Sequence, residues 1–197
     1  MSRTTKYKSI YFILIISSVG FVLFSILKFK DNYFVIVLLA VLFLIPGRVQ
    51  GFLCRNFFTG RRLMTHKKFQ DALLFFLEFD GELQDKKWLK YAIGLSGFVY
   101  TNSFNAMNKN NIGACYLESG VLNEAKKYFI SALDIDSEYP IPFYNLSIVS
   151  EIEGKHDLAI NQLNEAGRLG YARSTIDQVV SKAQEVYALI EGRKSKG

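Results

Sequence analysis

The chain has 197 residues, of which half are hydrophobic, and it carries a formal net charge of +6. The charge is uneven: residues 1–47 sum to +4 and residues 48–68 to +6, whereas residues 69–197, with 13 basic and 17 acidic side chains, sum to −4. Since a nucleic-acid-binding domain needs a basic surface on its folded body, this distribution argues against nucleic acid as a partner.

The first apolar stretch predicts a membrane span. Residues 1–9 form a short basic tail, and Ile10 to Leu27 then holds 18 residues without a charge, enough to cross a hydrocarbon core of ~30 Å. A cleaved signal peptide is the alternative interpretation. No small-residue cleavage site follows, and a second apolar run begins almost at once, so we favour a retained span.

The second apolar stretch runs from Tyr33 to Ile45 and is followed by Pro46-Gly47. It either continues as a helix through Leu53, or forms a shallow re-entrant hairpin with the first stretch; we favour two spans. The Lys/Arg balance places both ends in the cytoplasm. Residues 10–47 are therefore predicted to form a two-helix transmembrane hairpin of an integral protein of the plasma (inner) membrane, with both termini cytoplasmic.

Residues 48–104 are predicted to lie next to the membrane. The basic run Arg48–Lys68 suits anionic lipid headgroups. Gly51–Met64 is expected to be one helix that lies on these headgroups, starts a degenerate helix pair, or does both, and Lys68–Phe79 resembles the second helix of such a pair. An inserted helix is expected over Asp85–Tyr100. Its apolar face would hold Trp88, Ala92, Leu95 and Val99.

Residues 105–171 contain one pattern twice, 34 residues apart. Ile112, Gly113, Tyr116, Gly120, Ala125, Phe129 and Ala132 recur as Leu146, Ser147, Ser150, Gly154, Ala159, Leu163 and Ala166. A fixed period of this length is typical of stacked helix pairs, each of which buries a face that it cannot cover alone.

The stretch Asn111–Gly120, followed by Glu124-Ala125, resembles the tetratricopeptide repeat (TPR) family. The resemblance implies a short α-solenoid of two repeats, with the small residues Gly113 and Ala125 where two helices cross. The predicted fold is therefore all-α: a transmembrane hairpin, a TPR-like solenoid and a capping helix. That capping helix is expected over residues 172–191, and a disordered basic tail over 192–197.

The start of the capping helix is predicted from Ser174 and Asp177, which have the spacing of a capping box. Terminal repeats need a helix that covers the exposed end of the stack. The expected buried face consists of Ile176, Val179, Val180, Ala183 and Val186.

The TPR resemblance also implies where a partner binds, because ligand contacts in this family come mainly from the inward face of each first helix. By matching positions, that face holds Asn110, Ala114, Leu117, Glu118, Tyr144, Ile148, Glu151 and Ile152. An apolar centre edged by carboxylates suits an amphipathic partner with some positive charge. Alternatively, Leu117, Ile148 and Ile152 pack against the inserted helix around Trp88, which would fill the groove from within.

No catalytic or metal site is predicted. His66 and His156 have no partner at ligand spacing, Cys115 fits the repeat core, and Cys54 is expected to be an ordinary interfacial thiol rather than an acylated one. No cofactor is expected, and the chain is predicted not to be an enzyme.

Two further polar features are expected to have no specific role. Asp134, Asp136 and Glu138 are predicted to form a solvated acidic face rather than a calcium loop, and Asn145 is predicted to be a coincidental glycosylation sequon inside a helix. The predicted function is a membrane-anchored adaptor that binds another protein through the repeat groove. The alternative is a non-catalytic structural subunit whose hairpin packs with other transmembrane helices.

Overall fold

The structure is a computed structural model that describes the chain except for residues 1–2, 29–31, 91–99, 172–174 and 195–197. The described residues form helices and no strand, which confirms the all-α prediction. The helices are α1 (Arg3–Lys28), α2 (Tyr33–Leu53), α3 (Arg55–Thr65), α4 (Phe69–Asp85), α5 (Phe104–Glu118), α6 (Leu122–Ile135), α7 (Pro140–Ile152), α8 (His156–Arg168) and α9 (Ile176–Lys194).

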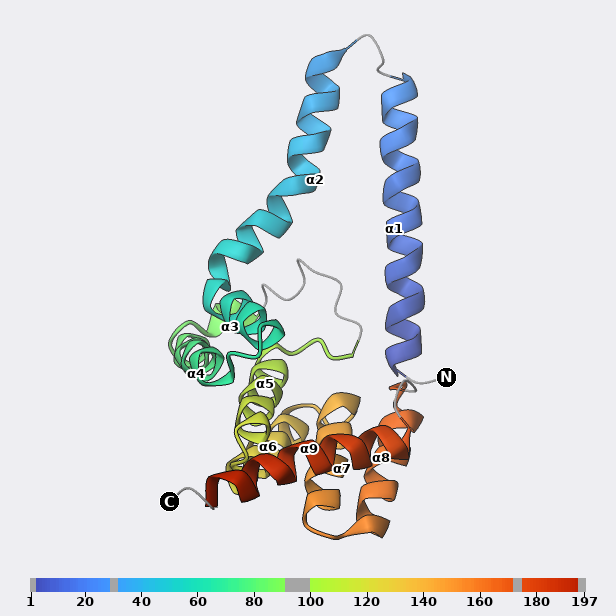
Figure 1. The fold of residues 1–197 in the computed structure, drawn as a ribbon. Helices are drawn as coiled ribbons and strands as arrows, with labels where there is room; N and C mark the ends of the chain where they lie inside the picture. Colours follow the sequence, from blue (N-terminus) through green and yellow to red (C-terminus); the bar gives the residue numbers. More distant parts are fainter. Residues whose placement is uncertain (1–2, 29–31, 91–99, 172–174, 195–197) are drawn as a thin grey trace.

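Helices α1 and α2 project from a body formed by α3 to α9, and they diverge from their connection toward that body (Figure 1). Within the described part of the chain, α1 is the one helix whose length and apolar composition would let it cross a membrane. Its apolar side chains are exposed, so it is not a core helix of the body; Phe12 and Phe24 illustrate this, with 64% and 60% of their surfaces accessible.

Helix α2 continues past Pro46 to Leu53, as in the longer of the predicted arrangements. The expected single helix over Gly51–Met64 is wrong, because α2 ends at Leu53 and α3 begins at Arg55, with Cys54 between them. The break changes the direction of the chain, and Phe57 of α3 becomes fully buried in the body.

The body contains three helix hairpins, α3–α4, α5–α6 and α7–α8, which are packed in sequence. Each turn has one residue with positive φ: Lys67 (58°), Gly120 (73°) and Gly154 (74°). The N–H of the following residue donates to a carbonyl five residues back in every turn, a geometry that ends helices. These bonds are Lys68 to Leu63, Val121 to Tyr116 and Lys155 to Ser150.

The hairpins also share a close helix crossing. A Cβ atom added to Gly60 would lie 2.8 Å from the Phe76 ring, and one added to Gly113 would lie 2.7 Å from the Phe129 ring. The fully buried Ser147 holds this position in the third hairpin. The facing small residues Ala72, Ala125 and Ala159 are all fully buried. Thus α3–α4 is a third pair in the register of the two sequence repeats.

The segment after α4 differs from the predicted helix over Asp85–Tyr100. Helix α4 itself extends to Asp85, and residues 87–90 form a short 3₁₀ turn, in which Leu89 is buried and Trp88 is 53% exposed. The tighter turn therefore directs the neighbouring leucine, and not the tryptophan, into the core. The remaining predicted face, Ala92, Leu95 and Val99, lies outside the described residues.

Helix α9 has the buried face that the sequence predicts, at Val179, Ala183 and Val186. Its start is different: Thr175 Oγ1 accepts a hydrogen bond from the Gln178 N–H, and the Gln178 side chain accepts one from the Thr175 N–H. This reciprocal pair is the capping box. Ser174, the predicted cap, lies outside the described residues.

Candidate functional site

The candidate site is one surface of α5 and α7, called here the first-helix face. Its two helices are joined by a buried hydrogen bond in which Asn145 Nδ2 donates to Asn110 Oδ1 over 2.9 Å. The face comprises the eight residues predicted from the sequence, Asn110, Ala114, Leu117, Glu118, Tyr144, Ile148, Glu151 and Ile152.

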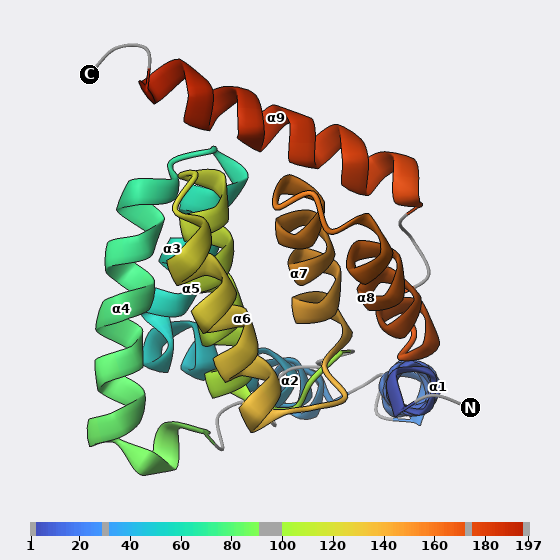
Figure 2. The ribbon, with the colours of Figure 1, turned by 90° about the horizontal axis from the view of Figure 1, so that it is seen from below.

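Helix α9 crosses the first-helix face at the end where α5 and α7 turn into α6 and α8 (Figure 2). Leu117 and Ile148, each 2% exposed, share a hydrophobic cluster with three residues of α9, Val179, Ala183 and Val186. This part of the face, the covered half, is therefore packed like a protein core.

An ion pair also joins α9 to the covered half. Lys182 Nζ of α9 lies 2.9 Å from Glu118 Oε2. Burial lowers the pKa of Lys182, but its hydrogen bonds with Glu118 and Glu185 outweigh that effect and raise the pKa overall. The described element that packs on Leu117 and Ile148 is thus α9, whereas Trp88 itself is exposed.

Two predicted residues have partners outside the covered half. The Tyr144 ring lies 5.2 Å from the Tyr171 ring, which in turn lies 5.7 Å from the Tyr100 ring. Glu151 Oε2 lies 2.9 Å from Nδ1 of the exposed His156. These contacts hold both side chains in place without closing the face over them.

The other end of the first-helix face, called here the open half, borders a cavity of about 390 Å³. Asn110 and Ala114 of the predicted set line it. Its other described lining residues, which come from α3, α5, α7 and the loops that precede α5 and α7, are Phe57, Arg61, Met64, Tyr100, Thr101, Met107, Asn111, Tyr139, Ile141 and Asn145.

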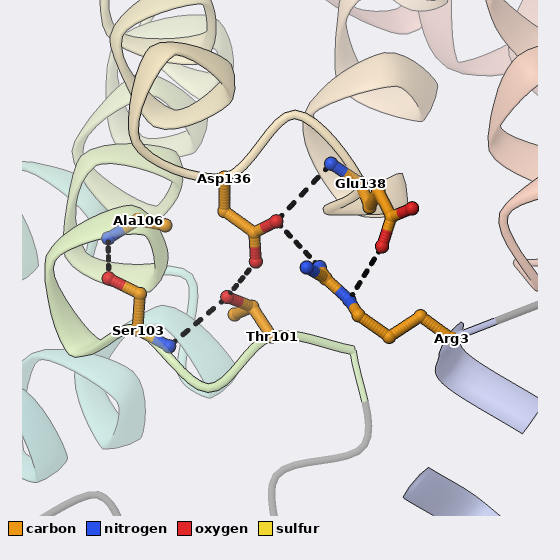
Figure 3. Close-up of polar contacts among 6 residues, drawn as sticks. All are labelled: Arg3, Thr101, Ser103, Ala106, Asp136 and Glu138. Carbon is orange, nitrogen blue, oxygen red and sulfur yellow. Dashed lines mark hydrogen bonds and ion pairs between the residues drawn. The ribbon is translucent and has the colours of Figure 1, made fainter. Parts of the chain in front are cut away.

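The start of α1 is attached beside this cavity (Figure 3). Arg3 Nη2 lies 2.6 Å from Asp136 Oδ1, and Arg3 Nε lies 3.2 Å from Glu138 Oε2. The Thr101 hydroxyl donates to the other Asp136 oxygen. The prediction of a solvated acidic face is therefore wrong for Asp136, which is 7% exposed. Nothing in the local sequence indicates this partner, because Arg3 lies 133 positions away.

Both cysteines belong to a hydrophobic core cluster, so the prediction of an interfacial thiol at Cys54 is wrong. Cys54 and Cys115 are fully buried, and burial raises the pKa of the Cys54 thiol to about 11 and that of Cys115 to about 12. Nucleophilic sulfur is the thiolate, so neither thiol is reactive near neutral pH. Among the described residues no group of three or more His, Cys, Asp and Glu side chains could hold a metal ion.

No protein-family model matches the chain, and no curated protein has a matching sequence.

Proposed function

We propose that this chain is a membrane-anchored scaffold of the TPR type, whose first-helix face binds an amphipathic helix of a partner protein. One observation carries the proposal: the covered half already holds such a helix. Helix α9 inserts Val179, Ala183 and Val186 between α5 and α7 and pairs Lys182 with Glu118. This is the ligand chemistry that the sequence of the face predicts.

The repeat assignment is supported by the three matched hairpins. Positive φ recurs at Lys67, Gly120 and Gly154, and the close glycine–phenylalanine contact of α5–α6 recurs in α3–α4. Stacked pairs of this kind make an extended surface from their first helices, and that surface is the usual binding site in repeat proteins.

The membrane anchor is supported by the exposed apolar surface of α1 and α2. Exposed side chains on α2 include Phe34 at 76% and Val37 at 60%. Soluble proteins rarely leave contiguous apolar patches of this kind in water. In the proposed arrangement both helices cross the plasma (inner) membrane, and the basic run Arg48–Lys68 lies near anionic headgroups.

The contact between Arg3 and Asp136 supports an even number of crossings. The contact joins the start of α1 to the body, and a single crossing would separate the two by the bilayer. Two spans keep both on one side, and the Lys/Arg balance then makes that side the cytoplasm.

The test uses a photocrosslinking amino acid at Ile152, beside α9, in cells that express the full chain. A matched probe at Leu158 on α8, which is 42% exposed, is the control. Both probes are also placed in a variant with Val179→Asp and Ala183→Asp, which detaches α9. We expect the Ile152 probe to crosslink a second protein once α9 is detached, and the Leu158 probe not to do so. Crosslinking at Ile152 to α9 alone, in both backgrounds, would show that the covered half is only core.

The structural-subunit alternative is favoured by a different observation. Helices α1 and α2 diverge and leave apolar surface on both, which a transmembrane helix of another protein could cover (Figure 1). Its test is the size of the particle extracted in a mild detergent. A large particle that is lost when Gly20 or Gly51 is changed to Leu supports this function, because small residues permit close helix contact.

A further inference from the structure

The cavity of the open half has three hydrogen-bond donors without a protein partner. Arg61, Asn111 and Tyr139 line it, and none of their side chains makes a hydrogen bond or ion pair within the described part of the chain. Tyr139 is the most constrained of the three, since it is only 3% exposed. Its ring is buried, whereas its hydroxyl is open to the cavity, where a ligand could accept its hydrogen bond.

The cavity favours an anion. No acidic side chain is present among its described lining residues. The carboxylate of Asp136, whose charge contributes to the raised pKa of Tyr139, accepts hydrogen bonds from Arg3, Thr101 and the Glu138 N–H, and Arg3 pairs with its charge. Burial raises the pKa of Tyr139, and the positive charge of Arg61 opposes that rise. Tyr139 is therefore a neutral donor at physiological pH.

The rest of the lining is mixed. Phe57 and Met64 of α3 and Ile141 of α7 are apolar, whereas Thr101, Asn110 and Asn145 are polar. At about 390 Å³ the cavity is in the range of small-molecule sites and would admit a group far larger than a single inorganic ion. A lining that combines hydrogen-bond donors with apolar side chains suits an anion that carries an apolar part.

The cavity lies between the body-side ends of α1 and α2. Arg61 is in α3, which follows α2 after a single residue, and Lys8 of α1 lies 5.1 Å from the centre of the Tyr100 ring, another wall of the cavity. Figure 2 shows α9 at one end of α5 and α7, and α1 and α2 toward the other. If α1 and α2 cross a bilayer, the cavity is therefore at the depth of the lipid headgroups.

We propose that this cavity binds the phosphate of an anionic phospholipid, with Arg61, Asn111 and Tyr139 as donors and the apolar side chains of the lining against the glycerol and first acyl carbons. The proposal rests on the membrane anchor proposed above. It differs from general attraction of the basic run to a charged surface, because it assigns one site to one guanidinium and two neutral donors.

The experiment is native mass spectrometry of the full chain, purified in detergent and titrated with dioleoyl phosphatidylglycerol or dioleoyl phosphatidylcholine. We expect the wild-type chain to retain one phosphatidylglycerol in preference to phosphatidylcholine. Arg61→Gln should weaken retention about tenfold, the effect of one charged hydrogen bond, and Tyr139→Phe about threefold. The control is Arg62→Gln, which removes the same charge from an exposed residue that does not line the cavity.

Each other outcome overturns the site. Equal losses in the Arg61 and Arg62 variants would mean that surface charge alone attracts the lipid. Full displacement of the lipid by an equal concentration of inorganic phosphate would make a free phosphate the ligand. A protein, instead of lipid, crosslinked by a probe at Asn111 in cells would make the cavity a peptide site.

The membrane anchor is tested separately by alkaline carbonate extraction of cell membranes. Release of the chain into the soluble fraction would refute the anchor, whereas the lipid titration in detergent does not depend on that result. Retention of the chain together with no preference for phosphatidylglycerol would refute only the headgroup site.

Discussion

The two halves of the first-helix face differ in chemistry and in occupancy. The covered half is apolar around Leu117 and Ile148, and the chain fills it with its own helix α9. The open half presents the donors of Arg61, Asn111 and Tyr139, and the described residues leave it as a cavity. Apolar surface is unfavourable in water, whereas polar donors are solvated there, so a fold must bury the first and can leave the second free for a ligand.

Detachment of α9 should have the largest effect on this arrangement. Val179 is fully buried, so Val179→Asp places a carboxylate in the hydrophobic cluster and should lower the free energy of unfolding by about 3 kcal/mol or more. The measurement is thermal unfolding of the full chain in detergent. Ser181→Asp, at an exposed position of the same helix, is the control. Equal melting temperatures for the two variants would show that α9 does not stabilise the covered half.

A substitution at the crossing of α5 and α6 should have the next largest effect on stability. Gly113→Leu forces a side chain into the Phe129 ring and toward the Ala125 carbonyl, and overpacking of this kind typically costs about 1–3 kcal/mol. The matched control is Gly167→Ala, at a helical glycine with no neighbour within 4 Å, which should leave stability unchanged or slightly increased. Circular dichroism during heating compares the two. A melting temperature for Gly113→Leu equal to that of wild type would contradict the close packing of α5 against α6 at Gly113.

The hairpins that form the face were predictable where the sequence repeats. The 34-residue period and the resemblance of Lys68–Phe79 to the second helix of a pair agree with the positions of α4 to α8. The turn of the first hairpin was not predictable, because Lys67 has the positive φ that glycine has in the other two turns. A left-handed lysine is unfavourable by itself and is held there by the packing of α3 on α4.

The occupancy of the face was only partly predictable. The periodicity of Val179, Ala183 and Val186 identifies the buried side of α9, but periodicity does not say which surface a helix covers. The cavity was missed because its donors come from α3, α5 and the loop before α7, at positions far apart in the chain. Arg61 and Tyr139 are far apart in the sequence, so the sequence alone does not show that both line this cavity.

Two adjacent asparagines should separate structure from binding in the open half. Asn110→Ala leaves the buried Asn145 amide without its acceptor and should cost about 1–3 kcal/mol. Asn111→Ala removes a donor that no protein group uses and should change stability by less than about 0.5 kcal/mol. Chemical denaturation of the two variants measures the difference. Equal losses would mean that Asn111 also supports the fold.

The smallest effect is expected at the ion pair that crosses from α9 to the face. The folded-state pKa of Lys182 is raised above its ordinary value of 10.5, so the pair contributes fully below that pH and is lost as pH rises through the folded pKa. Lys182→Met should lower stability by less than about 1 kcal/mol at pH 7, and the difference from wild type should vanish in strong alkali. Lys127→Met, which has no contact with α9, controls for lost charge. A difference that persists after Lys182 is deprotonated in the folded state would contradict this assignment.

The attachment of Arg3 to Asp136 has a consequence for the order of events during synthesis. A ribosome makes Arg3 well before Asp136, and at about 5–20 residues per second the 133 intervening residues take on the order of ten seconds. Through that interval the start of α1 lacks this acidic partner. If α1 spans a membrane as proposed, the ion pair forms only when the α6–α7 loop emerges on the same side of the bilayer, so a chain inserted with the opposite orientation would lack this contact between α1 and the body.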